Sequence, residues 1–425
     1  MHRQHREVLR GASAKRLHVG VLEMYLTKEE ERILAGELGE GNKKAMELLV
    51  AIGDAYDAKR MVPVTRAHAA SSGQEGDLYF VEFLADGGAY CKVPTTTNPV
   101  YDISYFHSIF EDIPYGEADI ARRVMEAYNR VGAILSWSCV PYLAENIPLF
   151  GEIVAFSESS ATPYVNSVIG ARTNREAAQS ALAAGVIGKT AEYGLLIKEN
   201  RKGTHLVKVE ATLKDEFDYT LLGYHVGKQV GYGIPVLTGI SKCPSTEEFV
   251  NFCAISNVPG AISMFHMPGI TVEASTLEEA FQNDVPQDKI TVGDAELRQI
   301  YKELQTTGGK IDFVMLGCPH YTLKQLGEVA GLLNGKRIHE SVSFWVCTSA
   351  TAKLLAERNG YINTIEGAGG HVVIDTCIDE PCWFEYKDKV GMTDSPKCAY
   401  YRRFKDARIG RLKDCVEAAV RGRTK

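Results

Sequence analysis

Short apolar runs alternate with amphipathic segments along the last third of the chain. Apolar runs of strand length lie at residues 311–316, 343–346 and 372–374. The first run is followed by a segment whose apolar residues recur at helical spacing on one face: Leu323, Leu326, Val329 and Leu332. Repeated strand–loop–helix units are typical of a parallel sheet with helices packed against it. We therefore predict an α/β fold with layered α/β/α domains and mostly parallel sheets.

The earlier part of the chain carries weaker signals of the same kind. Thr27 and Glu30 form a T-x-x-E capping box, which predicts a helix from there to about residue 38. Further apolar patterns predict one helix and three strands, at residues 117–131, 133–137, 207–213 and 261–266. The glycine-rich segment around residues 219–233 matches neither a P-loop nor a dinucleotide fingerprint, so it gives little support to a phosphate-binding loop.

The length of 425 residues is enough for two or three domains. Residues 1–23 are basic and lack a clear start signal for a fold, so we expect them to be an extension or tail. We expect an N-terminal and central α/β region at residues 24–289 and a C-terminal α/β domain at residues 290–425.

Residues 138–181 are unusually rich in small polar side chains. The stretch begins with Cys139, continues with a polar run at residues 157–160, and ends with Asn166 and a turn at residues 170–175. Burying such groups without partners costs about 1–3 kcal/mol each. The stretch is therefore more easily explained if it lines a site for a polar ligand, and a solvated loop is the alternative.

A second polar stretch, residues 94–99, reads Pro-Thr-Thr-Thr-Asn-Pro. The two prolines exclude a helix here. The hydroxyls of Thr95 and Thr96 and the amide of Asn98 suit a substrate pocket, and a solvated loop fits the local pattern equally well.

Four cysteines directly follow predicted strands: Cys139, Cys318, Cys347 and Cys377. Ligands of open parallel sheets bind at the carboxyl ends of the strands. Thiolates gathered at such ends are natural ligands for an iron–sulfur cluster or for zinc. Buried cysteine is also a common small apolar residue, and the chain has no C-x2-C pair, so spacing alone does not decide between these interpretations.

Two histidines and two arginines are further candidates for chemistry. His320 lies at the same predicted strand end as one of these cysteines, and His68 follows an earlier strand. Each is a candidate acid–base group, and a histidine with an ordinary structural role is the alternative. Arg172 and Arg175 flank Asn174 in one turn, where guanidinium groups suit carboxylate or phosphate oxygens and an ordinary ion pair is the alternative.

Composition narrows the class of protein. A formal net charge of -7 argues against a general nucleic-acid binder. No apolar run reaches the roughly 18–20 residues of a membrane helix, and the first residues lack the apolar core of a secretory signal. Ten cysteines without dense regular spacing indicate free thiols. We expect a cytoplasmic protein that binds neither nucleic acid nor membranes.

Several strings together resemble the catalytic large chain of the aconitase X family, in the family's order and over nearly the whole chain. They are VPTTTNP at 93–99, SCVPYLAENIP at 138–148, SESSA at 157–161, NSVIGARTNRE at 166–176, GCPH at 317–320 and DTC at 375–377. The string DSPKCAYY at 394–401 is similar to the family's serine-containing substrate loop.

The resemblance implies an aconitase-like fold and a dehydration reaction, with an iron–sulfur cluster as Lewis acid. The positions that match the cluster ligands are Cys139, Cys318 and Cys377. A 4Fe-4S cluster is expected, with 2Fe-2S and 3Fe-4S as the alternatives. The resemblance leaves structural roles for three other cysteines: Cys347, Cys382 and Cys398.

The resemblance also implies roles for other residues. His320 and Ser395 are the expected catalytic groups. The expected substrate-binding residues are Thr95, Thr96, Asn98, Ser159, Asn166, Arg172, Asn174 and Lys397.

The family further needs a small swivelling domain whose Gly-Arg-Gly-Ser-type loop supplies a catalytic serine. No such loop occurs in these 425 residues, so a separate small subunit is expected. The two-chain layout and the string GARTNRE favour 5-phosphomevalonate as the substrate, with cis-3-hydroxy-L-proline as the alternative. At residues 71–77 and 174–181, which are expected to lie at the pocket, the sequence departs from the family's pattern. A zinc-binding protein and a non-catalytic α/β binding protein are alternatives of other classes.

Overall fold

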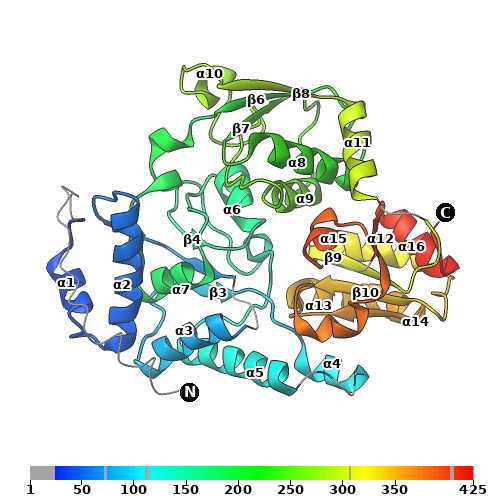
Figure 1. Ribbon diagram of the computed structural model, residues 1–425, viewed down its shortest axis with the longest axis horizontal. Helices are drawn as coiled ribbons and strands as arrows, with labels where there is room; N and C mark the ends of the chain where they lie inside the picture. The colour runs from blue at the N-terminus through cyan, green and yellow to red at the C-terminus, as the bar shows by residue number, and fades with distance from the viewer. Residues whose placement is uncertain are drawn as a thin grey trace, which may run out of the picture.

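The computed structural model describes residues 24–70, 74–110, 113, 115–305, 308–402 and 406–424. These residues form three units, each with its own parallel sheet. Figure 1 shows the first unit at the lower left, the second at the top and the third at the right, around a common centre. The expected extension at residues 1–23 lies outside the described residues.

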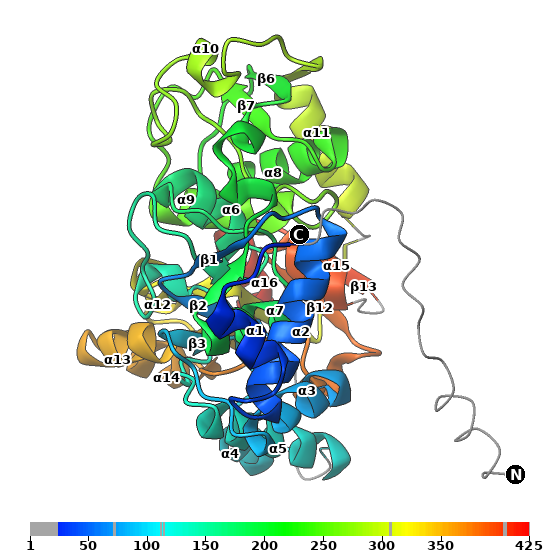
Figure 2. The ribbon, with the colours of Figure 1, turned by 90° about the vertical axis from the view of Figure 1, so that its left-hand side faces the viewer.

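The first unit is built on a short parallel sheet in which β2 (Ala67–Ala69) lies between β3 (Thr95–Thr97) and β4 (Ala155–Phe156). Helix α7 (Ala178–Ile187) packs on this sheet, and α2 (Glu40–Ala55) packs on α7. Seen from the side in Figure 2, α2 runs along the outside of the unit. The unit also contains α1 (Lys28–Leu34), α3 (Glu75–Asp86), α4 (Ile103–Ile109), α5 (Tyr115–Arg130), α6 (Ala161–Tyr164) and the antiparallel pair β1 (Met61–Pro63) and β5 (Lys189–Ala191).

The predicted capping box at the start of α1 is confirmed. The Thr27 hydroxyl accepts the Glu30 backbone N–H, and the Glu30 carboxylate accepts the Thr27 N–H at 2.7 Å. Because both side chains satisfy backbone N–H groups that the first helical turn leaves free, the local sequence fixes where this helix begins.

The second unit contains the parallel sheet β7 (Pro235–Thr238), β6 (His205–Val209) and β8 (Asp288–Val292), with β6 in the centre. The boundary expected at residue 290 falls inside β8. The helices are α8 (Glu216–Val230), α9 (Thr246–Ser256), α10 (Leu277–Ala280) and α11 (Asp294–Leu304).

The glycine-rich segment of the second unit is helix α8 and not a phosphate-binding loop. A Cβ atom on Gly223 would lie 2.8 Å from the Phe252 carbonyl oxygen, and one on Gly227 would lie 2.5 Å from that of Ser256. Glycine at these two positions lets α8 approach the backbone of α9 closely.

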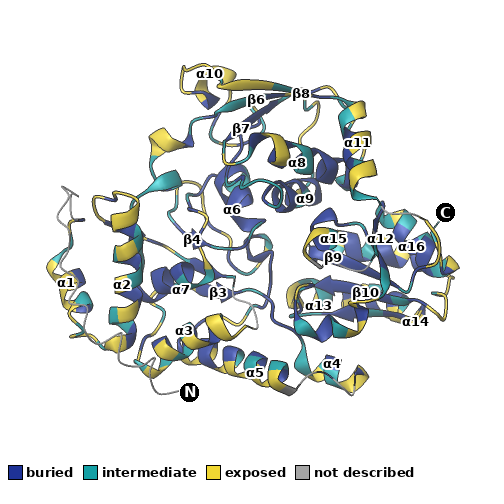
Figure 3. Ribbon diagram, in the orientation of Figure 1, coloured by how far each residue is buried: buried dark blue, intermediate teal, exposed yellow. Residues whose placement is uncertain are grey.

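The third unit has an all-parallel sheet in the order β11 (Gly370–Val373), β10 (Ser343–Thr348), β9 (Phe313–Tyr321), β12 (Val390–Thr393) and β13 (Asp406–Ile409). The central strand β9 is buried along its whole length, as Figure 3 shows. The strands predicted here are confirmed. The helices are α12 (Leu323–Leu333), α13 (Ala350–Arg358), α14 (Tyr361–Gly367), α15 (Pro396–Arg402) and α16 (Leu412–Arg421).

Two predicted strands, at residues 133–137 and 261–266, are wrong. Each segment makes a single bridge, from Ile134 to Thr96 and from His266 to Val236. The first ends at Trp137, whose φ of 41° cannot continue a strand. In the second, the Phe265 N–H donates to the Ser167 hydroxyl at 2.8 Å instead of to a neighbouring strand.

The fold class predicted from the sequence is confirmed, because all three main sheets are parallel and carry helices. Across the described ranges, no helix combines the length and the apolar character that crossing a bilayer requires.

Candidate active site

Three cysteines that are far apart in the sequence line one cavity of about 180 Å³ between the first and third units. Cys139 comes from the loop that follows residues 133–138, Cys318 from the carboxyl end of β9, and Cys377 from the loop after β11. The structure therefore brings together the three positions that the family resemblance implies as cluster ligands.

The backbone around Cys318 is shaped by the residue before it. Gly317 has a φ of 90°, and a Cβ atom there would lie 2.0 Å from the Cys347 carbonyl oxygen of the neighbouring strand. Only glycine fits so close to β10. Beyond the Cys318–Pro319 peptide bond, which is cis, the His320 N–H donates to the Cys139 sulfur at 3.2 Å. This contact joins the first thiol to the turn that carries the second.

The loop that carries Cys377 is held by the first unit. The Cys377 N–H donates to the Val100 carbonyl at 3.1 Å, and the Asp102 N–H donates to the Thr376 hydroxyl at 3.2 Å. The Cys377 sulfur accepts the N–H of Asp379 at 3.5 Å. The position of the third thiol thus depends on contacts between two units of the fold.

The three thiols are buried or nearly so, and burial dominates their protonation. It raises the pKa of Cys318 to about 11 and the pKa of both Cys139 and Cys377 further above the ordinary range. Without a bound metal ion these groups are therefore protonated at neutral pH, and binding of iron would displace their protons.

The donor set fits an iron–sulfur cluster better than a single metal ion. Among the residues that the structure describes, no three side chains of histidine, cysteine or acidic type converge as closely as one ion requires. A cluster bonds each thiolate to a different iron, so its ligands need only surround a common space. The shared cavity provides such a space.

The same cavity also contains a buried ion pair. The Lys397 ammonium donates to the Glu158 carboxylate at 2.9 Å and to the Ser159 hydroxyl at 2.6 Å. Burial alone would raise the pKa of Glu158, but Lys397 and the Ser160 N–H outweigh burial and lower it. The pKa of Lys397 is raised, because the charge of Glu158 outweighs the effect of its own burial. Both groups are therefore charged at neutral pH.

His320 lines the cavity with one ring nitrogen that has no partner. Its Nε2 lies 3.0 Å from the Thr376 carbonyl, which can only accept, so Nε2 carries the hydrogen. The buried Nδ1 has no hydrogen-bond partner. Burial lowers the pKa of His320 to about 4, so the ring is neutral at neutral pH and its Nδ1 lone pair is free.

Asn98, Ser159, His320 and Lys397 are the predicted binding and catalytic residues that line this cavity. The other predicted residues do not line it: Thr95, Thr96, Asn166, Arg172, Asn174 and Ser395. The Ser395 hydroxyl donates instead to the Cys318 carbonyl and accepts the Cys398 N–H. Ser395 thus holds the turn that carries a thiol.

The remaining polar residues of these stretches form hydrogen bonds with backbone groups that lie outside regular helices and strands. Asn166 bonds both Thr173 backbone groups and donates to the Ser263 carbonyl, while Asn174 bonds the backbone of Tyr193 and Leu195. The solvated-loop alternative is wrong for residues 94–99, since Thr95–Thr97 form the buried strand β3. It is also wrong for most of residues 138–181, where the polar side chains are largely buried and hydrogen-bonded.

Sequence reasoning missed several residues of the cavity wall, above all Glu158, Thr376, Asp379 and Tyr401. The signal for Glu158 was present, because it is the single acid within the small polar run 157–160. A single carboxylate that is buried among serines needs a cation nearby. Here the cation is Lys397, which lies 239 positions later in the sequence.

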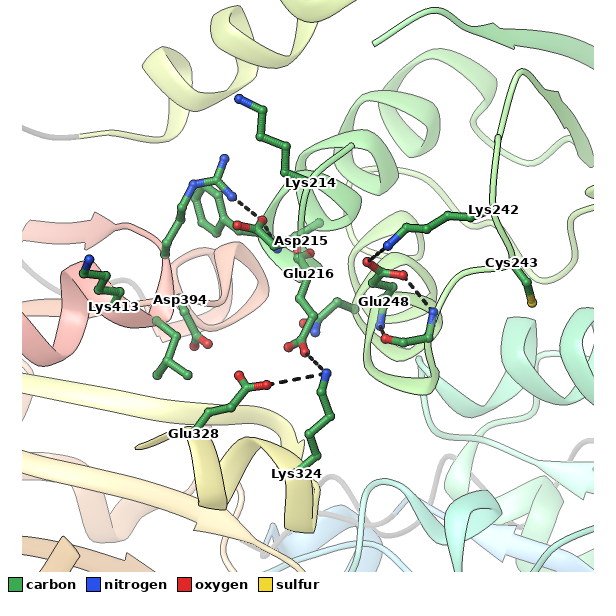
Figure 4. A pocket seen from close by; sticks show the side chains of 16 residues that line it. Lys214, Asp215, Glu216, Lys242, Cys243, Glu248, Lys324, Glu328, Asp394 and Lys413 are labelled. Atoms are coloured by element: carbon green, nitrogen blue, oxygen red, sulfur yellow. Dashed lines mark hydrogen bonds and ion pairs between the residues drawn. The ribbon is translucent and has the colours of Figure 1, made fainter. Parts of the chain in front are cut away.

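A larger cleft of about 570 Å³ lies between the second and third units (Figure 4). The amino-terminal ends of α8, α9, α12 and α16 contribute to its walls. Lys324 pairs across the cleft with Glu216 at 3.1 Å and along its own helix with Glu328 at 3.6 Å. Thiols from separate segments and an ion pair with both partners buried are thus features of the smaller cavity.

Comparison with known proteins assigns the chain to a family. The family models that match it are the aconitase X first domain at residues 23–199, second domain at 203–302 and third domain at 311–421. A crystal structure of Thermococcus kodakaraensis aconitase X in its holo-form is 36% identical, covers 93% of this chain and 100% of its own, and superposes with a TM-score of 0.84.

Curated relatives agree with the family models. A phosphomevalonate dehydratase large subunit of Methanocaldococcus jannaschii is 37% identical over 89% of this chain and 95% of its own length. The protein of the same name from Thermococcus kodakarensis is 38% identical, with the same coverage. A cis-3-hydroxy-L-proline dehydratase of Pseudomonas aeruginosa is 32% identical over 93% of this chain and 70% of its own length. The resemblance seen in the sequence is confirmed: the chain belongs to the aconitase X family and is an enzyme of the hydro-lyase class.

Proposed function

We propose that this chain is the large subunit of a two-chain dehydratase that removes water from 5-phosphomevalonate with the help of an iron–sulfur cluster. The observation that carries the proposal is the single cavity that holds three distant thiols, a buried lysine and a neutral histidine. Relatives named phosphomevalonate dehydratase large subunit, at 37–39% identity, support the choice of substrate.

Cys139, Cys318 and Cys377 would hold the cluster, which we expect to be of the 4Fe-4S type. When bound, such a cluster supplies a Lewis acid for the departure of a hydroxyl group. Three protein ligands suit this role, because a metal site that keeps one position open is a site that can bind substrate.

Lys397 is the residue that we expect to bind the substrate carboxylate. Its charge is maintained by Glu158, and its ammonium is already oriented by the Ser159 hydroxyl. A fixed cation in a buried cavity stabilises negative charge without the reorganisation that water would need. Asn98 lies in the same wall and offers an amide group.

His320 is our candidate for the acid–base group. A dehydration needs a base for a proton on the carbon next to the carboxylate, and the free Nδ1 of the neutral ring has the required lone pair. The hydrogen bond from Nε2 to the Thr376 carbonyl fixes the tautomer that leaves Nδ1 free.

The partner is a small subunit that carries a catalytic serine. The relatives' names describe large subunits, which implies a small one. In this chain the Ser395 hydroxyl is engaged with the Cys318 carbonyl, so a serine from a second chain would supply the missing hydroxyl at the cavity.

Coexpression with the small subunit under anaerobic conditions, followed by assay of the purified complex, tests the proposal. We expect dehydration of 5-phosphomevalonate by the complex, none by this chain alone, and visible absorption of an iron–sulfur centre. Dehydration of cis-3-hydroxy-L-proline instead would identify the other substrate, and a colourless zinc protein would contradict the cofactor assignment. Full turnover by this chain alone would rule out the need for a partner.

A further inference from the structure

A hydrogen-bonded relay of four buried or partly buried side chains leads from the interior of the first unit to the wall of the thiol cavity. Its members are Asn146, Thr96 of β3, His68 of β2 and Asn98. His68 and Thr96 face each other across the parallel strands, and the first three residues are almost fully buried. The fourth lines the cavity.

The direction of each hydrogen bond follows from the first contact. Asn146 Nδ2 lies 2.8 Å from the Ala67 carbonyl, which can only accept, so this end of the amide is the nitrogen. The same nitrogen lies 2.9 Å from the Thr96 hydroxyl and donates to it. The Thr96 hydroxyl must then give its own hydrogen to another acceptor.

That acceptor is the ring of His68. The Thr96 oxygen lies 2.9 Å from His68 Nδ1 and 3.5 Å from the Ala67 carbonyl, so the bond to the ring is the shorter one. A ring that accepts at Nδ1 carries its hydrogen on Nε2 when it is neutral, and burial lowers the pKa of His68 to about 4. His68 Nε2 lies 3.4 Å from Asn98 Oδ1 and donates to it.

The last bond settles which end of the Asn98 amide meets the substrate. We propose that Asn146, Thr96 and His68 are positioning residues that hold Asn98 Oδ1 against His68, so that the Asn98 NH₂ group faces the cavity as a donor. This wall then selects a ligand that presents an oxygen acceptor, such as a carboxylate. The inference rests on the dehydratase function proposed above, because it gives the donor a substrate to bind.

Thr96→Val removes the relay hydroxyl while keeping the shape of the side chain. The His68 ring then loses the group that fixes its tautomer, and the amide of Asn98 is free to turn its oxygen toward the substrate. In the complete complex we expect KM to rise about 10- to 100-fold, the value of a hydrogen bond to a charged group, with kcat changed less than about threefold. Thr96→Ser keeps the hydroxyl and restores KM.

Thr97→Val is the matched control. Thr97 is equally buried in the same strand, but its hydroxyl contacts the Ile134 carbonyl and the Trp137 N–H, outside the relay. We expect a similar loss of thermal stability from Thr96→Val and Thr97→Val, but a raised KM only from the first. An equal KM in Thr96→Val, Thr97→Val and the parent complex would overturn the proposal.

A second measurement does not depend on turnover. In a complex labelled with ¹⁵N-histidine, the His68 resonances, assigned by their loss in His68→Gln, should report a hydrogen on Nε2. A hydrogen on Nδ1 overturns the relay. The expected tautomer in a complex that dehydrates neither substrate would leave the relay intact and contradict the proposed function instead.

Discussion

The thiol cavity and the larger cleft between the second and third units use similar side chains in opposite ways. In the cavity, Lys397 and Glu158 pair while only 10% and 7% of their side chains are exposed. In the cleft, Lys324 pairs with three carboxylates while its own side chain is 52% exposed. The cleft has roughly three times the volume, but the lysine that pairs its carboxylates is exposed to solvent.

The comparison shows that burial of the cation, and not volume, distinguishes the candidate active site. A solvated ion pair is worth about 0–1 kcal/mol and is readily exchanged for contacts with water. A buried pair costs several kcal/mol of desolvation, so it persists where the surrounding groups hold it in one geometry. In the cavity those groups are Ser159 and Ser160.

The largest expected effect comes from removing a thiol. Cys377→Ser should abolish the binding of iron and lower dehydratase activity at least about 1,000-fold, since a Lewis acid contributes several kcal/mol to such reactions. Iron and sulfide content with visible absorption measures the first, and turnover by the complex measures the second. Cys243→Ser, at the exposed cysteine of the cleft, is the control and should change neither. Iron retained at the parent level in Cys377→Ser would contradict the proposed ligand set.

Breaking the buried ion pair should come next. Lys397→Met leaves Glu158 buried without its cation and should lower the free energy of unfolding by about 3–5 kcal/mol, with loss of substrate binding. Lys324→Met is the matched variant in the cleft and should cost no more than about 1 kcal/mol. Urea unfolding of both variants measures the difference. Equal costs would remove the distinction between the two regions.

The smallest effect concerns the pH dependence of the cleft. Burial raises the pKa of Glu216 from 4.5 to about 7, against the opposing effect of Lys324. Its contribution to stability is therefore fully present below pH 4.5 and is lost as the pH rises through 7. Glu216→Gln removes this dependence. When the pH rises from 5 to 8, the free energy of unfolding of the variant should therefore increase by on the order of 1–2 kcal/mol relative to that of the parent. Urea midpoints at the two pH values test this, and a constant difference would contradict it.

Sequence patterns predicted the third unit better than the first two. Its strands are continuous apolar runs, because a parallel sheet covered on both faces needs apolar residues throughout. The strands of the first unit are two or three residues long, and much of its backbone is satisfied by side chains such as Asn166 and Asn174. A pattern of apolar positions does not reveal this kind of bonding.

The same reasoning explains which site residues were identified. The three cysteines and His320 follow strands or segments that the pattern and the resemblance both marked. The role of Glu158 depends on its ion pair with Lys397, and that contact forms only because the third unit packs on the first. Arg172 and Asn174 were selected for their polarity, yet they bond the backbone at Leu196, Tyr193 and Leu195.

The cysteines of the thiol cavity come from distant positions in the sequence as well as from two units of the fold. Cys139 precedes Cys377 by more than half of the chain, and Val100 and Asp102 of the first unit hold the loop that carries the last sulfur. The three sulfurs therefore surround one cavity only when the third unit is packed on the first. A truncated product that ends before β11 would lack Cys377, and with it the third sulfur of the proposed cluster site.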